Sequence, residues 1–474
     1  MTDIKRITRE TPAPAPGIVH LGPGAFFRAF IGPYTDEAIA AKGGAWGITA
    51  VSLQSPRARD ALVPQDCAYM AVERGPAGDI ARQIGSIRQV LVAPEDPQAV
   101  IAAIAAPETR IVTLTVTEKG YCHNPRDGSL QVDHPDIQHD LANPHTPRSA
   151  VGFLVAGLER RLAGGLPPFT VLTCDNLPAN GTVVRQVVLG FAALRDPDLA
   201  DWIADQAAFP CCMVDRITPA TTDADFAALA ASEGIDDPAM VVHEPFRQWV
   251  IEDKFPQGRP AWDAVGAQIV TAVGAHELMK LRCLNGTHST LAYLGYLAGH
   301  ETISDAVADP AFASLCERLW RDEILPTVPA PQGEDLRAYC AALLSRYRNP
   351  AIRHRTWQIA MDGSQKLPQR LLGTLRDNLA AGKMPKGLCL AIAGWMRYAG
   401  GLDEAGDTID VRDPLAGELQ AASRSSDPVP AFLAMESIFG DDLAGNGDLV
   451  TTIRNAFDAL AENGATATVR DFNL

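Results

Sequence analysis

A strand that runs directly into a glycine turn and a helix constrains the fold of this chain more than any other feature. Residues 17–21 (GIVHL) have the composition of a buried strand, Gly22 and Gly24 form the turn, and a helical pattern continues to about residue 41. A second strand is expected at residues 46–53, at the spacing of a βαβ unit. This order predicts a dinucleotide-binding fold with a parallel or mixed sheet.

The character of the sequence changes at about residue 275. Before it, further strands are expected at residues 84–92, 110–117, 169–174 and 240–242, with a helix at 97–106. After it the pattern is helical, with helices expected at residues 291–299, 311–325, 335–346, 366–381 and 449–462. A chain of 474 residues is too long for one hydrophobic core. We therefore expect an α/β protein with an N-terminal Rossmann-type domain (residues 1–270) and a mainly α-helical, substrate-binding and catalytic C-terminal domain (residues 271–474).

The composition of the chain indicates which kinds of molecule it can bind and where in the cell it is expected. A formal net charge of −16 argues against nucleic acid and against an anionic membrane surface, which favours a small-molecule substrate. The nine cysteines lack paired C-x-x-C spacing, which is typical of a reducing cytoplasm. No H-E-x-x-H or zinc-type spacing occurs, so we expect a site without metal. Residues 1–16 contain no apolar signal-like run, and no run elsewhere reaches membrane-spanning length, so we expect a cytoplasmic protein.

The glycine turn is a candidate cofactor site. Gly22 and Gly24 fit the first two positions of G-x-G-x-x-G, where the backbone approaches a pyrophosphate at a helix N-terminus, but Phe27 occupies the third. A simple strand-to-helix turn would use the same glycines. The second strand ends without the acid that usually binds the ribose 2′-hydroxyl of NAD. Gln54 can bond a hydroxyl and Arg57 suits a 2′-phosphate, so NAD and NADP both stay open.

The segment of residues 279–289 (MKLRCLNGTHS) is a candidate catalytic site. It places Lys280, Asn285 and His288 within a largely apolar stretch, and a buried lysine has a lowered pKa that suits acid/base work. On one straight helix, Lys280 and His288 would point about 80° apart and lie roughly 12 Å apart along the axis. We expect the helix to break at Asn285 and Gly286, which would turn the later residues toward the lysine. The alternative is an ordinary amphipathic helix whose lysine faces water.

Six segments together resemble one family. They are residues 20–28 (HLGPGAFFR), 115–121 (TVTEKGY), 174–181 (CDNLPANG), 213–219 (MVDRITP), 244–250 (EPFRQWV) and the lysine segment. In this order they are similar to the polyol-specific long-chain dehydrogenase/reductases, the mannitol dehydrogenase family. The resemblance implies a zinc-independent, nicotinamide-dependent oxidoreductase, with NAD(H) as cofactor and NADP(H) as the open alternative. It also implies a monomer or a weak oligomer.

The resemblance assigns expected roles to individual residues. Lys280 matches the family's catalytic lysine, Asn176 and Asn285 match the asparagines that hold the reacting oxygen, and His288 matches a histidine that orients the substrate. Asp215 matches an aspartate that lines the same site, and Glu277 a glutamate on the proton path. Taken alone, Asn176 fits a turn, Asp215 a helix N-cap and Glu277 a surface position. The residues expected to bind the cofactor are Gly22, Gly24, Phe26, Arg28, Gln54, Thr117, Glu118 and Lys119.

The choice of substrate depends on residues 353–368 (RHRTWQIAMDGSQKLP), which resemble the fructuronate reductase branch of the family. Gln358 stands where the mannitol branch has an arginine, and Lys366 belongs to the D-G-S-x-K motif. The basic triplet that ends at Arg355 offers a carboxylate partner in an otherwise acidic chain, or it solvates a helix end. We expect reversible reduction of D-fructuronate to D-mannonate. The alternatives are a mannitol or arabinitol 2-dehydrogenase and, more remotely, a nucleotide-binding protein without catalysis.

Overall fold

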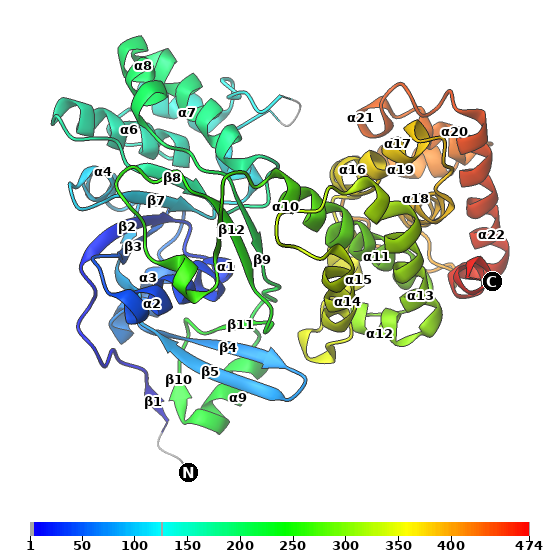
Figure 1. Cartoon of the computed structure of the whole chain (residues 1–474), viewed down its shortest axis with the longest axis horizontal. Helices are drawn as coiled ribbons and strands as arrows, with labels where there is room; N and C mark the ends of the chain where they lie inside the picture. The colour runs from blue at the N-terminus through cyan, green and yellow to red at the C-terminus, as the bar shows by residue number, and fades with distance from the viewer. Residues whose placement is uncertain (1–3, 125–126, 474) are drawn as a thin grey trace. The chain divides into compact units, whose positions relative to one another are not determined.

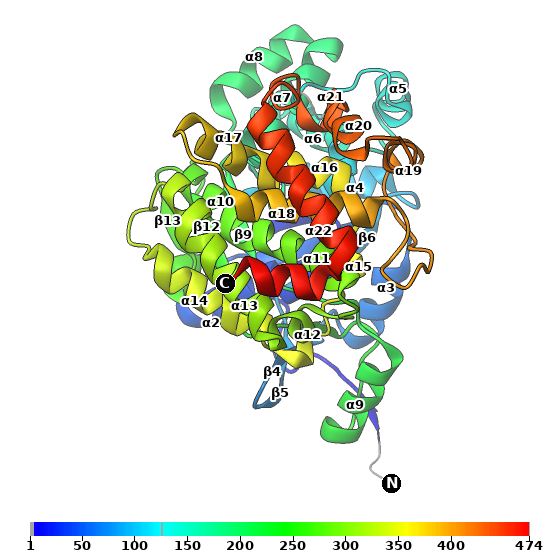
Figure 2. The same ribbon diagram turned by 90° about the vertical axis from the view of Figure 1, so that its right-hand side faces the viewer.

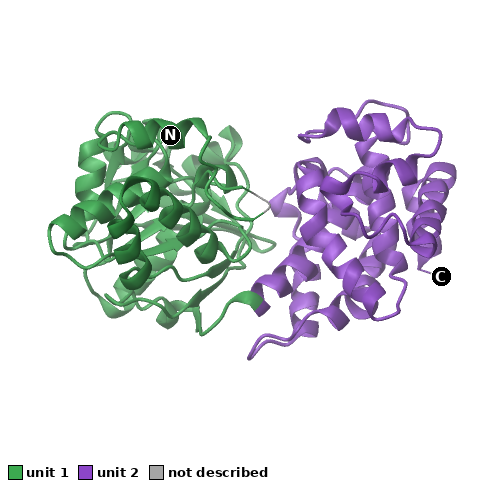
Figure 3. Ribbon diagram, turned by 90° about the horizontal axis from the view of Figure 1, so that it is seen from above, with its two compact units in different colours: residues 1–274 green, residues 275–474 purple. Residues whose placement is uncertain are grey.

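The chain divides into two compact units, Met1–Gly274 and Ala275–Leu474, drawn in two colours in Figure 3. A computed structural model describes residues 4–124 and 127–473. The first unit combines a parallel sheet with helices, and the second is helical (Figure 1). The predicted fold class is therefore confirmed.

The first unit is built on a five-stranded parallel sheet with the strand order β6-β3-β2-β7-β8. In chain order the five strands follow the Rossmann arrangement 3-2-1-4-5. The direction in which strands are added reverses between β2 and β7. In such sheets ligands bind beyond the carboxyl ends of the strands at this point. The strands are β2 (Pro16–Leu21), β3 (Gly47–Ser52), β6 (Ile87–Val92), β7 (Ile111–Leu114) and β8 (Thr170–Thr173).

Side chains of the central strands alternate between two cores, as the period of a strand requires. Val19 and Leu21 of β2 pack in a cluster with residues of α4 (Pro97–Ala105), α6 (Ala150–Ala163) and α7 (Asn180–Arg195). Ile18 packs in the other cluster, with residues of α1 (Ala25–Ala29) and α2 (Ile31–Lys42). Both faces of the sheet are thus covered by helices, which explains why its strands read as continuous apolar runs.

Smaller sheets complete the first unit, and the sequence pattern did not predict most of them. Their strand orders are β11-β4-β5 and β13-β12-β9, and β1 and β10 form a separate pair. The strand expected at residues 84–92 is two strands. Gly85 N donates to Asp36 Oδ1 (2.8 Å) and Ser86 Oγ donates to Gly32 O (2.9 Å), so these two residues turn between β5 and β6. The strands are β1 (Lys5–Arg6), β4 (Tyr69–Gly75), β5 (Gly78–Ile84), β9 (Cys212–Asp215), β10 (Ile235–Asp236), β11 (Val241–His243), β12 (Gln248–Glu252) and β13 (Gln268–Val270).

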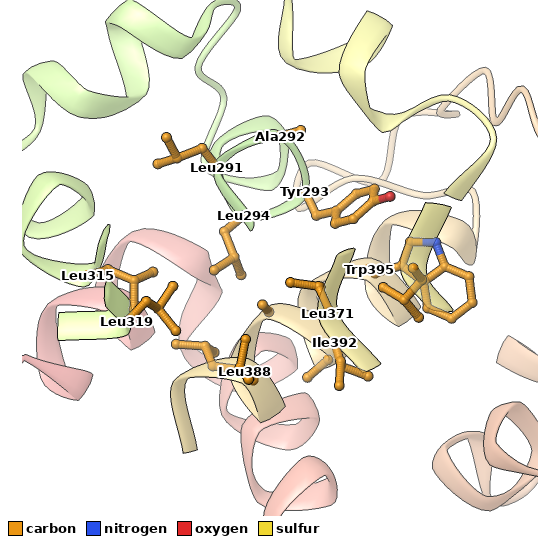
Figure 4. Packing of buried hydrophobic residues seen from close by; sticks show 14 of the residues in the cluster. Leu291, Ala292, Tyr293, Leu294, Leu315, Leu319, Leu371, Leu388, Ile392 and Trp395 are labelled. Carbon is orange, nitrogen blue, oxygen red and sulfur yellow. The ribbon is translucent and has the colours of Figure 1, made fainter. Parts of the chain in front are cut away.

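The second unit packs helices around α11 (Thr287–Leu297) and α18 (Lys386–Ala399). Leu291 and Leu294 of α11 share a core with Leu388 and Ile392 of α18 (Figure 4). The long helix α22 (Gly447–Phe472) packs along α18 and changes direction at Gly464, whose φ of 78° is not helical (Figure 2). This core holds the segment that contains Lys280.

The remaining helices connect and cover these cores. In the first unit they are α3 (Arg57–Leu62), α5 (Pro135–Ala142), α8 (Pro197–Gln206) and α9 (Asp223–Glu233). In the second they are α10 (Gly274–Met279, beginning at the division), α12 (Ile303–Ala308), α13 (Pro310–Arg318), α14 (Leu336–Tyr347), α15 (Thr356–Ala360), α16 (Gly363–Leu367), α17 (Gly373–Ala380), α19 (Ala416–Ser423), α20 (Pro428–Leu433) and α21 (Glu436–Phe439).

All nine cysteines are buried and free. None of the helices in residues 4–124 and 127–473 is both long and apolar enough to cross a membrane.

Candidate active site

The glycine turn lies at the carboxyl end of β2, and its backbone conformation explains the first of its two glycines. Gly22 has a φ of 92°, and a Cβ atom there would overlap the carbonyl group of Thr115. Glycine therefore fits where other residues would be strained. Gly24 caps α1 without a side-chain hydrogen bond, and within the described residues a Cβ atom on it would meet only Gly22 O, at 3.9 Å. The backbone at Gly24 is thus open to close approach by a ligand.

Two side chains support this turn, the buried His20 and the partly buried Arg28. The Nε2 of His20 lies 3.1 Å from Gly22 O, and its Nδ1 lies 2.8 Å from Thr113 Oγ1. Because a carbonyl can only accept, Nε2 carries the proton and Nδ1 accepts from the threonine. Burial lowers the pKa of His20 to about 3, so the ring is neutral. Arg28 donates from Nη1 to Pro23 O (2.6 Å) and from Nε to Ala239 O (3.1 Å), and so braces the turn through its backbone.

The other predicted cofactor residues of this unit lie beyond the carboxyl ends of neighbouring strands. Gln54 is exposed just after β3, and Thr117, Glu118 and Lys119 are exposed after β7, where Glu118–Tyr121 form a 3₁₀ helix. The strand expected at residues 110–117 ends earlier, at Leu114. Phe26, in α1, is partly buried and stacks on Phe30 with the ring centroids 5.0 Å apart.

Two further candidate site residues of the first unit, Asn176 and Asp215, lie at or just beyond the ends of strands in two different sheets. Asn176 is exposed in the turn that follows β8. Asp215 is the last residue of β9, pairs with Gln248 of β12 and is 4% exposed. The alternative of Asp215 as a helix N-cap is therefore wrong, because the residue belongs to a strand.

In the second unit, the expected helix break at Asn285 and Gly286 is wrong. Residues Lys280–Gly286 form a π-helix that continues α10 into α11. Residues five apart point about 140° apart on an α-helix, whereas the i→i+5 bonding of a π-helix places them on one face. Lys280 and Asn285 are five apart, so the π-helix brings them toward the same face of the helix without a break, whereas His288 follows in α11. The ammonium-bearing side chain of Lys280 is 8% exposed.

Partners from elsewhere in the second unit stabilise this wider turn. Thr287 Oγ1 donates to Cys283 O (2.7 Å), and Trp320 Nε1 donates to the same carbonyl (2.9 Å). Tyr347 Oη donates to Leu284 O (2.9 Å). A π-helix interrupts the regular i→i−4 ladder, so side chains that satisfy its carbonyl groups favour it.

His288 follows in α11 and lies among other basic groups. Its ring stacks on Tyr347 (5.3 Å between centroids) and meets His354 edge-on (4.7 Å). Burial, with the nearby His354 and Arg370, holds the pKa of His288 well below its usual range, and burial lowers the pKa of His354 to about 4. Both rings are neutral near pH 7. Among the described residues, His288 Nε2 and His354 Nδ1 are buried without a hydrogen-bond partner.

The predicted substrate-binding residues lie in different surroundings. Arg355 is 55% exposed and approaches Glu301 at 3.5 Å, as Arg353 does, so these two arginines face an acid at the surface. Gln358 is exposed in α15. Lys366 is partly buried in α16 and donates from Nζ to Met361 O (2.5 Å). Glu277 is partly buried in α10.

Comparison with known protein families covers both units. Residues 16–264 match the mannitol dehydrogenase Rossmann domain, and residues 272–461 match the mannitol dehydrogenase C-terminal domain. The chain belongs to the mannitol dehydrogenase family. The family identification and the prediction of an oxidoreductase are thereby confirmed.

Individual members of the mannitol dehydrogenase family are similar over nearly their whole length. D-mannonate oxidoreductase of Escherichia coli (strain K12) is 48% identical over 455 residues, 94% of either chain. Mannitol 2-dehydrogenase of Aspergillus terreus is 43% identical over 462 residues, 96% of this chain and 92% of that protein. Among solved structures, the ternary complex of Pseudomonas fluorescens mannitol 2-dehydrogenase with NAD and D-mannitol is 39% identical and has a TM-score of 0.88, covering 97% of this chain and 94% of that chain.

The sequence did not predict the roles of several residues at these sites. His20 and Asp175 lie in the quoted motifs, but nothing in their spacing indicates that they bond the backbone of neighbouring loops. Tyr347 carries no sequence signal at all, since it reaches the π-helix from α14. Within the described ranges, no group of three or more His, Cys, Asp or Glu side chains is placed to hold a metal ion.

Proposed function

We propose that this protein reduces D-fructuronate to D-mannonate with NADH, and catalyses the reverse oxidation with NAD. The observation that carries the proposal is the 48% identity with D-mannonate oxidoreductase over 94% of both chains. NAD is favoured over NADP by the related mannitol 2-dehydrogenase, whose structure contains NAD. The open backbone at Gly24 and the positive φ of Gly22 suit the pyrophosphate of either cofactor.

In the proposed reaction, the cofactor supplies the hydride and this chain handles the charge and the proton. Negative charge builds on the carbonyl oxygen as the hydride arrives, and the amide groups of Asn176 and Asn285 donate hydrogen bonds to it. Lys280 then donates a proton in reduction or accepts one in oxidation. Its place on the face of the π-helix that also carries Asn285 supports this pairing of roles.

A uronate differs from a neutral ketose by its carboxylate, which needs a basic partner. His354 supports this part of the proposal, because its buried Nδ1 lacks a hydrogen-bond partner among the described residues, and Arg370 and Lys366 lie near enough to depress its pKa. Arg355 is the second candidate for this role and is already near Glu301. We propose that a carboxylate binds at this basic group.

Steady-state kinetics test the proposal. NADH oxidation is measured with D-fructuronate and with D-fructose at equal concentrations, and repeated with NADPH. A kcat/KM at least tenfold higher for fructuronate, about 1.4 kcal/mol of transition-state discrimination, is expected. The variants His354→Asn and Arg355→Ala then identify the carboxylate partner, since loss of that partner lowers this preference without lowering turnover of fructose equally.

A polyol 2-dehydrogenase is the second candidate function. The 43% identity with a mannitol 2-dehydrogenase and the TM-score of 0.88 to another favour it. A preference for fructose over fructuronate in the same assay would establish it. The arginines near Glu301 would then be surface charges.

A further inference from the structure

The carboxylate of Asp175 connects the ends of two neighbouring strands of the Rossmann sheet. Asp175 follows β8, and its Oδ2 and Oδ1 accept hydrogen bonds from the backbone N–H groups of Val116 (2.9 Å) and Thr117 (3.2 Å), which follow β7. Tyr121 Oη donates to Oδ2 as well (2.6 Å). One side chain thus satisfies two backbone amides and a phenol at the carboxyl edge of the sheet, where a dinucleotide binds in this fold.

The backbone that Asp175 holds is strained. Thr117 has φ 66° and ψ 163°, a region that is populated almost entirely by glycine. A β-branched side chain makes this conformation still less favourable. An exposed threonine keeps such a geometry only where its surroundings impose it, and the two hydrogen bonds to Asp175 fix the peptide groups directly before the Cα atom of Thr117.

Asp175 is itself fixed from the opposite side. Tyr121 Oη also bonds the hydroxyl of Thr173, the last residue of β8. The side chain of the fully buried Asn180 donates from Nδ2 to Asp175 O (3.2 Å) and to Cys212 O (2.8 Å). The position of Asp175, and with it the start of the turn that contains Asn176, is therefore determined by groups from β8, α7 and β9.

We propose that Asp175 is a positioning residue, which holds the loop of residues 117–119 in a strained conformation that binds the nicotinamide cofactor and sets the adjacent Asn176. The inference rests on the proposed nicotinamide-dependent function. In this role Asp175 acts through the loop and through Asn176, and does not itself touch the reacting atoms. Relaxation of the Thr117 backbone to a common conformation would break its hydrogen bond to Asp175, and the loss of this bond opposes the relaxation.

The test separates strain from general stability. Asp175→Asn keeps the size of the side chain but replaces one acceptor by a donor that faces backbone N–H groups. We expect it to weaken NADH binding at least tenfold, measured by fluorescence titration. Thr117→Gly removes the strain, because glycine tolerates φ 66° and ψ 163°. In the Thr117→Gly background we expect Asp175→Asn to weaken NADH binding less than threefold, because glycine keeps this conformation without the carboxylate.

Asp140→Asn is the matched control. Asp140 is buried, whereas Asp175 is partly buried, and it likewise accepts from two backbone amides and a hydroxyl, those of Arg148 N (2.8 Å), Ser149 N (2.9 Å) and Ser149 Oγ (2.6 Å). We expect a comparable fall in Tm without weaker NADH binding.

Three outcomes count against the proposal. NADH binding by Asp175→Asn within twofold of the wild-type value would overturn it, and so would a tenfold loss of binding when Asp175→Asn is added to Thr117→Gly. A wild-type protein that does not bind NADH at all would overturn the proposed function, and this inference with it.

Discussion

Replacing each glycine of the turn by alanine separates a structural role from a cofactor role. Gly22→Ala forces a Cβ atom into the carbonyl group of Thr115 at a φ of 92°. Strain of this kind costs of order 1–3 kcal/mol, and overpacking adds a similar amount. We therefore expect the free energy of unfolding of the first unit to fall by about 3 kcal/mol.

Gly24→Ala should weaken NADH binding without lowering stability. Gly24 has φ −71° and ψ −173°, which alanine adopts readily, and its Cβ atom would stand 3.9 Å from Gly22 O. Alanine there leaves stability unchanged or raises it by about 0.4–1 kcal/mol, because it restricts the unfolded chain. If a pyrophosphate approaches this backbone, the added methyl group weakens binding by roughly 1–3 kcal/mol, so NADH affinity falls about fivefold to 150-fold.

The assay pairs thermal unfolding without cofactor with titration of NADH fluorescence. Gly417→Ala, in α19 of the second unit and without a heavy atom within 4 Å of the new Cβ among the described residues, controls for the general effect of the substitution. A Gly24→Ala variant that keeps wild-type stability and wild-type NADH affinity would refute the location of the pyrophosphate. A Gly22→Ala variant with unchanged Tm would refute the steric argument.

Three other measurements test the remaining reasoning. Lys280→Ala should lower kcat by about 10²–10⁴ while the Kd for NADH stays the same; near-normal turnover would remove Lys280 from acid/base catalysis. The ratio of kcat/KM for fructuronate to kcat/KM for fructose should rise as the pH falls from 7 to 5, by up to about tenfold per pH unit. The reason is that a bound carboxylate favours protonation of His354, whose pKa is about 4 when no carboxylate is bound. A flat ratio would leave His354 out of carboxylate binding. Since His20 has a pKa of about 3 in the folded chain and about 6.5 when unfolded, the unfolded state binds more protons below pH 6.5 and stability falls by ~1.4 kcal/mol per pH unit toward pH 3. Urea unfolding of His20→Gln at pH 4–6 should show a shallower pH dependence, and an unchanged slope would contradict a buried neutral ring.

The elements predicted well from the sequence are those specified by local pattern. Residues 17–41 gave a strand, a turn and a helix because apolar runs and glycines are local signals, and β2, α1 and α2 lie there. The parallel topology follows from the alternation of strands and helices. The short strands β9, β12 and β13 carry little periodicity and pair over long separations in the chain, so their pattern was not distinctive.

The parts that could not be predicted depend on distant partners. The π-helix at Lys280 is supported by Trp320 and Tyr347, which are 37 and 63 residues away from the carbonyl groups they bind. The backbone amide of Thr117 donates to a carboxylate 58 residues later in the chain. Residue types and their spacing predicted which groups are candidates, whereas tertiary contacts determine the backbone that presents them.

The burial of every native thiol makes this protein convenient for spectroscopy. Because all nine cysteines are enclosed in the folded chain, they should react slowly with maleimide dyes under native conditions. A cysteine introduced at an exposed position in each unit would then carry nearly all of the label, without a cysteine-free background. Energy transfer between the two dyes then measures the separation of the two labelled positions with and without cofactor and sugar.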